Sequence, residues 1–594
     1  MAYYVTTLLV YGGVDAIACL ALSQQFGVGG VTNFAFIVFQ AAGAYAAAVL
    51  SLPSDSANGA FQTYVGGLSL PFPLPLLGAM VAGGLLALPF AVLVGKRLRG
   101  DFAAVGLLVT AVMANLLVTN YRPFLNGDAG LALVPAPFQS RINPQSSAYQ
   151  WGYGAVAVVL ALLTYLFVNR VTESPYGRSL RAMRDNDVVA DALGKNLTSL
   201  RTSMLVLGGA IAGLSGGVLV GFINLWDPAA WGYAESIVLF AAVIIGGLGN
   251  HRGAILGAVL VPLGFLEASR YIPDTFGGPG LVPALQWVAV GLVIVLFLWF
   301  RPQGILPERR RAIAGTSGRE PDDAPPVGRI AVPRGVARPA GKPEIVLEAR
   351  GLVRSFEGVR AVDGVSVSFQ QGRLTGLIGP NGAGKSTLLG MLAGTMPASE
   401  GAVLYRGEDV TRAPAYRRAR SGLIRTFQLA SEFRRLTVIE NLLSAVPDQK
   451  GDSLRGALRG RRYWGSQERL AIARAETMLE RFGLTAYADT YAADLSGGQR
   501  RLVEIMRALM AEPQVLLLDE PMAGVHPQLA HQIGELLLGL CADGITIVMV
   551  EHELAIMDEF ADPVVVMADG RVLAEGPMAA LRAREEVVEA YLVG

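Results

Sequence analysis

The stretch of sequence that decides the fold of this chain is Gly379-Pro380-Asn381-Gly382-Ala383-Gly384-Lys385-Ser386-Thr387. It follows an apolar run at 374–378, which predicts a strand, and it leads into a helical run at 387–393. Glycines in this context let backbone N–H groups converge on phosphate oxygens at a helix N-terminus, where the helix dipole also favours anions. We therefore expect a phosphate loop in which Lys385 reaches the β- and γ-phosphates and Ser386 ligates Mg²⁺. A glycine-rich turn without a ligand is the weaker alternative.

A second apolar run, at 515–518, ends in Asp519 and Glu520. An acid at the end of a buried strand beside a phosphate loop is well placed to bind Mg²⁺. The next acid, Glu520, is then placed to polarise a water molecule that attacks the nucleotide. The alternative, an ordinary solvated strand end, loses support once the phosphate loop is accepted.

The two halves of the chain differ in composition. Of 594 residues, 52% are hydrophobic and 16% are charged, but 25 of the charged residues lie in the first 300 positions and 72 in the remaining 294. Soluble domains average roughly 25% charged residues, so the first half cannot be soluble and the second half can. About nine runs are apolar enough to predict membrane-spanning helices. They lie near 5–22, 31–50, 77–95, 102–119, 151–169, 203–222, 234–249, 253–268 and 283–300.

The distribution of Lys and Arg predicts the orientation of the spans. One alternating set of loops holds fourteen of these residues, and the opposite loops hold Arg122, Arg141 and Arg270. The positive-inside rule then places the N-terminus outside and residue 301 inside. We predict a multidomain chain, a polytopic α-helical membrane domain followed by an α/β P-loop NTPase domain. Its parts are a permease-like domain at 1–301, a Pro/Gly/Arg-rich linker at 302–344 and the NTPase domain at 345–594.

Charge and cysteine content exclude several classes of protein. The net charge is +1 and there is neither a long basic block nor an acidic tail, so no nucleic-acid partner is expected. The two cysteines, Cys19 and Cys541, exclude a disulfide framework and a cysteine-rich metal site.

Twenty residues before Asp519 the chain reads Leu495-Ser496-Gly497-Gly498-Gln499. This stretch resembles the signature of ABC-transporter ATPases, and the NTPase domain is identified as a member of that family. The resemblance implies an ATP hydrolase that binds ATP and Mg²⁺. It also implies that the signature contacts the γ-phosphate held by the opposite protomer, so that a complete site needs two ATPase domains. From the residues alone, Ser496 and the amides of Gly497 and Gly498 cap a helix that begins near Gln499.

The resemblance implies roles for further residues. Gln428 resembles the Q-loop glutamine, expected to act in catalysis and at the Mg²⁺ site, and His552 resembles the switch histidine that acts with Glu520. Phe356 resembles the aromatic residue that stacks on adenine. The alternatives are a structural role for His552 and a core position for Phe356. His526 stands where many ABC ATPases carry Asp, which leaves the coupling between the two ATP sites open.

Two sets of segments resemble the components of one transport system. The segments 425–428, 436–442 and 586–592 resemble the LivG-type ATPase of branched-chain amino acid importers. The segments 98–102, 174–185 and 245–249 resemble the LivM-type permease. The resemblance implies a fused permease and ATPase subunit that imports branched-chain or related amino acids. It implies a multi-pass protein of a prokaryotic inner (plasma) membrane, with the ATPase domain in the cytoplasm.

The resemblance also implies partners. One permease and one ATPase domain require a LivH-like permease with a second ATPase subunit, or else a homodimer, and an extracytoplasmic substrate-binding protein. An amphipathic segment at 176–194 is expected to dock on the ATPase near the Q-loop and to transmit its closure. On pattern alone, an ordinary charged loop helix fits this segment equally well.

Several alternatives stay open at this stage. The solute is undecided, and urea, short amides and aromatic or organic acids are alternatives to branched-chain amino acids. A complex of another class, which signals or remodels without moving a solute, is a further alternative. Polar residues in or near the spans either line a path or bridge helices; they are Asp15, Gln25, Asn33, Asn115 and Glu267.

Overall fold

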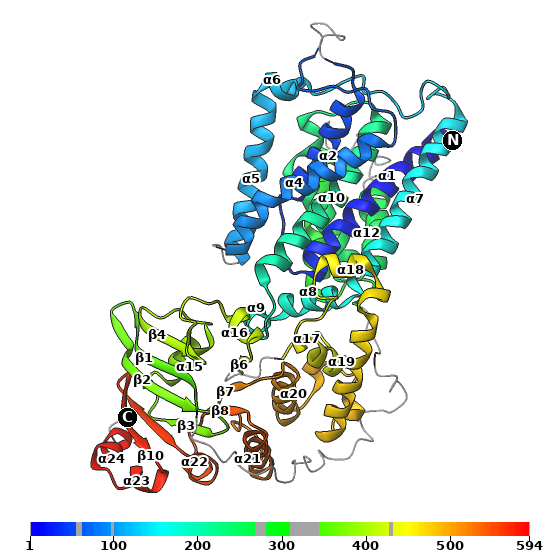
Figure 1. The fold of residues 1–594 in the computed structure, drawn as a ribbon. Coiled ribbons are helices and arrows are strands. Elements are labelled where there is room, and N and C mark those ends of the chain that lie inside the picture. Colours follow the sequence, from blue (N-terminus) through cyan, green and yellow to red (C-terminus); the bar gives the residue numbers. More distant parts are fainter. Residues whose placement is uncertain are drawn as a thin grey trace. The chain divides into compact units, whose positions relative to one another are not determined.

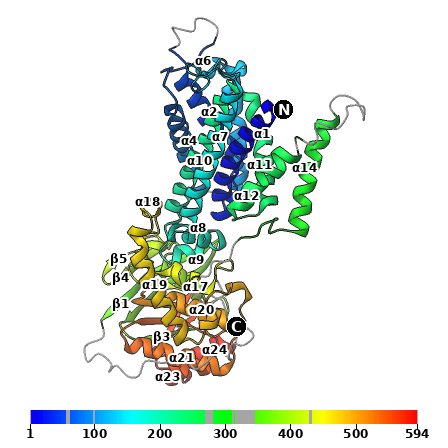
Figure 2. The same cartoon turned by 90° about the vertical axis from the view of Figure 1, so that its right-hand side faces the viewer.

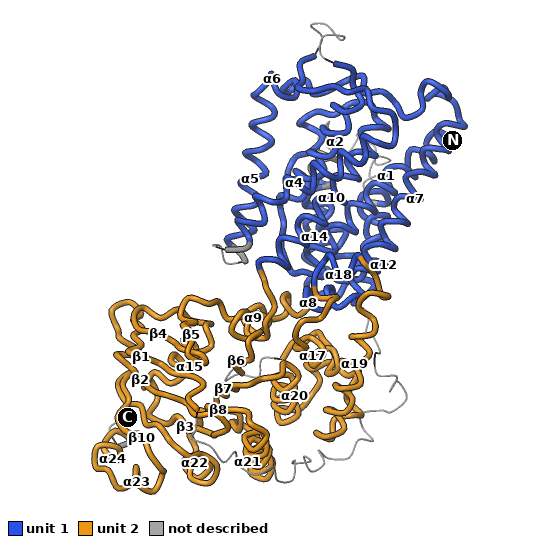
Figure 3. The backbone as a smooth tube through the Cα atoms, viewed as in Figure 1, with its two compact units in different colours: residues 1–180, 198–309, 453–458 blue, residues 181–197, 310–452, 459–594 orange. Residues whose placement is uncertain are grey.

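The fold is that of a computed structural model, which describes residues 2–54, 62–96, 100–265, 267, 281–308, 313, 344–426 and 432–592. The chain divides into two compact units (Figure 3). Unit 1 comprises residues 1–180, 198–309 and 453–458, and unit 2 comprises residues 181–197, 310–452 and 459–594. Unit 1 is built of apolar helices and unit 2 contains two β-sheets, which confirms the predicted fold class.

The long helices of unit 1 follow the apolar runs of the sequence. They are α1 (Ala2–Leu22), continued by the π-helical turn η1 (Ser23–Val28), α2 (Phe36–Ser51), α4 (Leu74–Lys96), α5 (Gly100–Asn120), α7 (Ser147–Thr172), α10 (Leu197–Ile223), α11 (Tyr233–Gly246), α12 (His251–Ala258), continued by η5 (Val259–Phe265), and α14 (Leu281–Phe300). Figures 1 and 2 show α1 alongside α7 and α2 alongside α4, and Figure 2 shows α14 at the edge of the unit.

Among the described residues, five helices are long and apolar enough to cross a membrane: Tyr3–Val28, Leu74–Val94, Phe102–Asn120, Ser147–Thr172 and Leu197–Ile223. Four further apolar helices are shorter: Phe36–Ser51, Tyr233–Gly246, His251–Gly264 and Trp287–Phe300. Each predicted apolar run therefore overlaps a helix among the described residues. The number of spans and their orientation stay predictions.

The glycine-rich stretch at 246–250 forms a tight turn between α11 and α12. Gly247 has a φ angle of 132°, which favours glycine. The Asn250 side chain caps α12 by accepting two backbone N–H groups at 3.0 and 3.3 Å. A Cβ atom on Gly246 would lie 2.0 Å from the Gly253 carbonyl oxygen, so the small residues here serve close packing of the two helix ends.

Three polar side chains of the apolar region connect separate segments. The Gln25 amide donates to the Leu205 carbonyl at 3.3 Å, and the Asn33 amide donates to the Gln25 side-chain oxygen at 2.9 Å. The Asn115 amide donates to the Pro228 carbonyl at 2.9 Å. Gln25 and Asn115 therefore bridge helical segments, whereas Asn33 lies in the loop after η1 and contacts the preceding turn.

Close packing of α10 against α2 and α4 depends on glycine. A Cβ atom on Gly43 of α2 would lie 2.3 Å from the Gly213 Cα atom of α10. A Cβ atom on Gly213 would lie 2.2 Å from the Ala79 carbonyl oxygen of α4, and one on Gly209 would lie 2.6 Å from the Gly83 carbonyl oxygen. Backbone atoms cannot yield as a flexible side chain can, so any larger residue at these positions forces the helices apart.

We expect the substitution Gly213→Leu to destabilise unit 1 by at least about 1–3 kcal/mol, the usual cost of overpacking. The matched control is Gly152→Leu on α7, because a Cβ atom at Gly152 has no neighbour within 4 Å. The measurement is the thermal unfolding midpoint of the full chain in detergent. Equal midpoints for the two variants would contradict the packing argument.

Unit 2 is built on two sheets. One has four strands in the order β2 (Val359–Gln370), β1 (Ile345–Phe356), β4 (Glu400–Tyr405) and β5 (Glu408–Asp409). The other has six strands in the order β10 (Arg571–Gly576), β9 (Val564–Ala568), β3 (Leu374–Ile378), β8 (Thr546–Val550), β7 (Val515–Asp519) and β6 (Leu423–Arg425). The strands from β9 to β6 run parallel, so their carboxyl ends meet at one edge (Figure 1). Every residue of β3, β7 and β8 is buried, as expected for parallel strands covered on both faces.

The helices of unit 2 are α9 (Asp187–Ala192), α15 (Lys385–Ala393), α16 (Ala415–Arg420), α17 (Val438–Ala445), α19 (Arg461–Arg481), α20 (Gly497–Met510), α21 (Pro527–Ala542), α22 (Leu554–Phe560), α23 (Met578–Arg582) and α24 (Glu585–Leu592). The chain also forms the short helices α6 (Arg122–Leu125), α8 (Pro175–Asp185) and α18 (Leu454–Arg459).

Residues 181–197 belong to unit 2 although they come between two long helices of unit 1. The amphipathic segment predicted at 176–194 consists of two helices, α8 and α9. Asn186 separates them and caps α9. Val189 and Leu193 are buried in the same hydrophobic cluster as residues of α17 and α20. The segment is therefore not an ordinary solvated loop helix.

Candidate functional site

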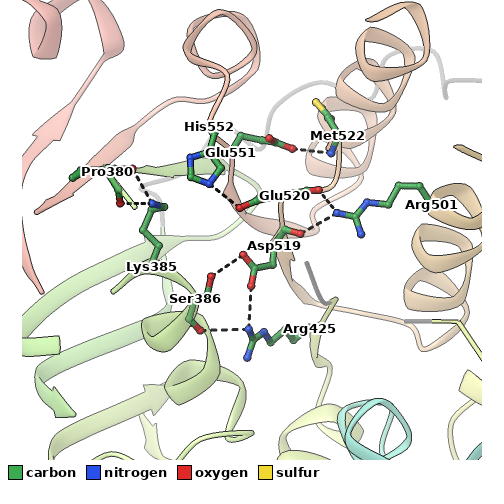
Figure 4. A network of polar contacts seen from close by, with 11 residues as sticks. Pro380, Lys385, Ser386, Arg425, Arg501, Asp519, Glu520, Met522, Glu551 and His552 are labelled. Atoms are coloured by element: carbon green, nitrogen blue, oxygen red, sulfur yellow. Dashed lines mark hydrogen bonds and ion pairs between the residues drawn. The ribbon is translucent and has the colours of Figure 1, made fainter. Parts of the chain in front are cut away.

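The predicted phosphate loop connects β3 to α15. Gly379, Gly382 and Gly384 have φ angles of 152°, 84° and 91°, conformations that L-residues rarely adopt. The Lys385 ammonium group donates to the Gly379 and Pro380 carbonyl oxygens at 2.8 and 2.9 Å (Figure 4). The loop thus curls around its own lysine at the start of a helix, which is an arrangement suited to phosphate.

The electrostatics of Lys385 reflect its burial. Desolvation lowers the pKa of its ammonium group, and the nearby carboxylates of Glu520 and Asp519 oppose that shift. Asn381 and Gly382 are exposed at the loop surface and Thr387 is half-buried in the first turn of α15. The positive charge and the surface of the loop therefore lie where an anionic ligand can be bound.

Asp519, the last residue of β7, lies beside the loop. Its Oδ1 atom accepts a hydrogen bond from the Ser386 hydroxyl at 3.2 Å, and its Oδ2 atom lies 3.1 Å from the Arg425 guanidinium group (Figure 4). The Asp519 side chain is 2% exposed, so these two partners offset the cost of burying it.

The donor set fits Mg²⁺. Within the described part of the chain, no three His, Cys, Asp or Glu side chains form a group that could hold a metal ion. Mg²⁺ in a nucleotide site uses only one or two protein oxygens besides phosphate and water, and a serine hydroxyl with an adjacent carboxylate supplies them. Gln428, the third predicted ligand, lies outside the described residues.

Glu520 and His552 meet at the edge of the sheet. The Glu520 backbone has a φ angle of 50°, and its N–H donates to the Val550 carbonyl at 2.9 Å. The His552 Nε2 atom and the Glu520 Oε1 atom lie 2.7 Å apart (Figure 4). This contact is the one expected if His552 acts with Glu520, and the role of His552 stays a prediction.

Two buried charged residues that the sequence analysis missed hold the turn after β7. The Arg501 guanidinium group donates to the carbonyl oxygens of Pro521 at 2.9 Å and Asp519 at 3.0 Å. The Glu551 carboxylate accepts the Met522 N–H at 2.7 Å. Burial raises the pKa of Glu551, and hydrogen bonds from the Met522 and His552 backbones partly offset the rise. In the sequence only their positions could have indicated these two residues, since Arg501 follows the signature and Glu551 precedes His552.

The signature residues begin a different helix. Helix α20 starts at Gly497, two residues earlier than predicted, and Ser496 caps it by accepting the Gln499 N–H at 3.4 Å. The Gln499 side chain accepts the Ser496 N–H at 2.9 Å, which completes a capping box with Gly498 inside the first turn. The cap expected from the residues is therefore present, and the signature lies outside the contact network of Figure 4.

Phe356 lies at the end of β1 in the other sheet. Its side chain is 41% exposed, and the Arg354 guanidinium group lies 4.8 Å from the ring centroid. The alternative that Phe356 is a core residue is therefore wrong. An exposed ring with a cation on one face has room to stack on a planar ligand.

His526, which stands where many ABC ATPases carry aspartate, caps a helix. It precedes α21, and its Nδ1 atom accepts the Gln528 N–H at 3.3 Å. Aspartate and asparagine usually supply this bond through a side-chain oxygen. The imidazole of His526 therefore supplies the N-cap acceptor at the start of α21.

We expect His526→Ala to lower the free energy of unfolding of unit 2 by about 1 kcal/mol, the usual cost of a lost N-cap. His526→Asp restores an acceptor and should unfold like the unchanged chain. Calorimetry of the three full-length chains measures the difference. If alanine and aspartate behave alike, the cap contributes nothing.

Comparison with known proteins gives the class and the family of the chain. Residues 362–523 match the ABC transporter family, and residues 4–298 match the family described as branched-chain amino acid transport system / permease component. The chain is 37% identical over 247 residues to a probable branched-chain amino acid transport ATP-binding protein LivG of Archaeoglobus fulgidus, a match that covers 42% of this chain and 95% of the relative. It is 36% identical over 248 residues to the high-affinity LivG protein of Escherichia coli K12, covering 42% and 97%.

Among solved structures, the chain is similar to a nucleotide-free ATP-binding cassette from an ABC transporter. The two sequences are 37% identical, the TM-score is 0.37, and the match covers 42% of this chain and 99% of that chain. The nucleotide site and the sequence matches define an ATPase of the ABC class. The chain belongs to the branched-chain amino acid ABC transporter family, and it fuses a permease and an ATP-binding protein in one polypeptide.

Proposed function

We propose that this chain is the fused permease and ATPase subunit of an importer of branched-chain or related amino acids. The observation that carries the proposal is the presence, in one chain, of a family permease at 4–298 and a nucleotide site built by 379–387, Asp519 and Glu520. The names of the relatives support the class of solute, since LivG proteins are described as branched-chain amino acid transport proteins.

In this proposal, Lys385 and the loop amides bind the phosphates of ATP. Ser386, Asp519 and Gln428 hold Mg²⁺, which neutralises charge on the phosphates when it is bound. Glu520 orients the attacking water, and His552 holds the Glu520 carboxylate through the 2.7 Å contact. Phosphoryl transfer depends mainly on such positioning and on charge stabilisation.

The proposal includes partners and a membrane. The signature at 496–499 is assigned to the nucleotide of a second ATPase domain, and Phe356 to the adenine ring. The second half of the transporter is then a LivH-like permease with its ATPase, or a second copy of this chain. An extracytoplasmic binding protein delivers the solute. We place the permease at 1–301 in a prokaryotic inner membrane with an outer N-terminus, the linker at 302–344 and the ATPase at 345–594 in the cytoplasm.

We further propose that residues 181–197 transmit ATPase closure to the permease. Two ion pairs, one buried and one partly buried, attach the segment to the ATPase fold. The Arg181 guanidinium group lies 2.8 Å from the Glu440 carboxylate, with side chains 11% and 2% exposed. Lys195 pairs with Asp452 at the other end of the segment. Buried ion pairs are sensitive to geometry and charge, so they support one defined register between the segment and the ATPase.

We expect Glu520→Gln to abolish ATP hydrolysis, by at least about 100-fold, while ATP binding persists, because the amide cannot act as a base. Hydrolysis is measured by phosphate release and binding by a fluorescent ATP analogue. The control is Glu512→Gln, an exposed carboxylate that pairs with Arg474. Glu520→Gln protein that hydrolyses ATP at the unchanged rate would refute the assigned role.

Reversal of the Lys195 and Asp452 charges tests the coupling segment. We expect Lys195→Glu and Asp452→Lys each to reduce solute-stimulated ATPase activity, since each places two like charges together at a partly buried contact. The double variant restores opposite charges and should recover most of the stimulation. Activity is measured with the chain and its partners in proteoliposomes. A double variant as impaired as either single variant would show that the ion pair does not matter.

The solute itself is identified by stimulation of ATPase activity. We expect the reconstituted transporter to respond to a binding protein loaded with leucine, isoleucine or valine. A response restricted to urea, short amides or aromatic acids would support an importer but show that the solute is not a branched-chain amino acid. Activity indifferent to every loaded binding protein would instead favour a complex that does not transport.

A further inference from the structure

Arg425 occupies a place in the nucleotide site that the proposed mechanism does not use. It is the last residue of β6, and β6 pairs in parallel with β7, where Arg425 lies opposite Leu517. Its side chain is 9% exposed and points to the carboxyl edge of the sheet, between Ser386 and Asp519 (Figure 4). Burying a guanidinium group is costly unless its partners use the charge.

The contacts of Arg425 reach both predicted protein ligands of Mg²⁺ that the structure describes. One terminal nitrogen lies 3.1 Å from the Asp519 Oδ2 atom and 3.3 Å from the Ser386 carbonyl oxygen. The other terminal nitrogen donates to the Thr395 hydroxyl at 2.9 Å. One rigid planar group therefore ties the end of β7 to the start of α15 and to the loop that follows α15.

The two oxygens of Asp519 are divided between different partners. Oδ2 is held by Arg425, while Oδ1 faces the Ser386 hydroxyl at 3.2 Å, on the side where the metal ligands converge. A carboxylate held at one oxygen cannot rotate freely, so its other oxygen keeps its direction. Groups that hold metal ligands in this way usually affect metal affinity by 10- to 100-fold.

We propose that Arg425 is a positioning residue for Mg²⁺: it fixes Asp519 through Oδ2 and Ser386 through its carbonyl, and so presents Oδ1 and the serine hydroxyl to the metal. The proposal rests on the proposed ATP site. The Arg425 guanidinium group lies beside the Asp519 carboxylate, and arginine is effectively always protonated in proteins. Lysine cannot reproduce the planar fork.

Arg425 could also have the opposite effect on Mg²⁺ binding, through electrostatic repulsion. A positive charge beside Asp519 also repels Mg²⁺, and its removal would strengthen metal binding if charge alone mattered. Positioning and repulsion thus predict changes of opposite sign when Arg425 is replaced. The sign of the change in Mg²⁺ requirement decides between them.

The experiment compares the full chain with Arg425→Met and Arg425→Lys. The matched control is Arg418→Lys, because Arg418 is also buried beside α15 but donates to the Met391 and Leu392 carbonyls at its far end. The readouts are the affinity for a fluorescent ATP analogue in EDTA and in Mg²⁺, and Mn²⁺ binding measured by electron paramagnetic resonance.

We expect Arg425→Met to bind the analogue in EDTA within about two-fold of the unchanged chain and to need about 10- to 100-fold more Mg²⁺ or Mn²⁺ for half-saturation. Arg425→Lys should fall between, and Arg418→Lys should not change the requirement. ATP hydrolysis by Arg425→Met should recover largely at saturating Mg²⁺, because Arg425 does not contact the reacting groups.

An unchanged or lower metal requirement in Arg425→Met would overturn the proposal, as would an equal loss of binding in EDTA and in Mg²⁺, which marks a purely structural role. If Arg425→Met does not fold, Arg425→Lys decides by the same criterion. Failure of the ATP site itself is distinct, because the unchanged chain would then not bind the analogue in EDTA or in Mg²⁺.

Discussion

The parallel pairing of β3, β8 and β7 is the constraint on which the ATPase depends. These strands are buried on both faces, so their polar backbone groups pair with each other, and because the strands run parallel, their carboxyl ends meet at one edge. That edge receives the phosphate loop from β3, Asp519 and Glu520 from β7, and His552 after β8. The chemistry of the site follows from the order of strands in the sheet.

Several charged and polar groups lie together at this buried edge, and each needs a partner that offsets the cost of its burial. Arg425 and Arg501 are such partners from outside the nucleotide motifs, the first at the Asp519 carboxylate and the second at the backbone carbonyls that follow β7. Glu551 completes the arrangement by accepting the Met522 N–H. The motif residues therefore stand in a shell of buried arginine and glutamate contacts, and removal of one partner leaves an uncompensated charge.

The segment 181–197 shows how the permease sequence contributes to the ATPase fold. Its apolar residues enter the cluster of α17 and α20, and its two ends carry the Arg181–Glu440 and Lys195–Asp452 pairs. Glu440 also completes the capping box of α17 with Thr437. Hydrophobic contacts hold the segment against α17 and α20, and the ion pairs favour one register. Because the two proteins are fused in one polypeptide, each permease domain is made together with one ATPase domain.

The sequence by itself determined the local elements and the residues of the motifs. Glycine spacing defined the phosphate loop at 379–387, an apolar run ending in two acids defined Asp519 and Glu520, and low charge density defined the apolar helices. Each of these signals lies within a few consecutive residues, because it depends on backbone conformation or on the period of one helix or strand. Only the tertiary structure decided that Arg425 meets Asp519, that Gly213 contacts α4, and that residues 181–197 join the ATPase core. Those contacts join residues far apart in the chain, and they depend on strand order and helix packing, which no local pattern encodes.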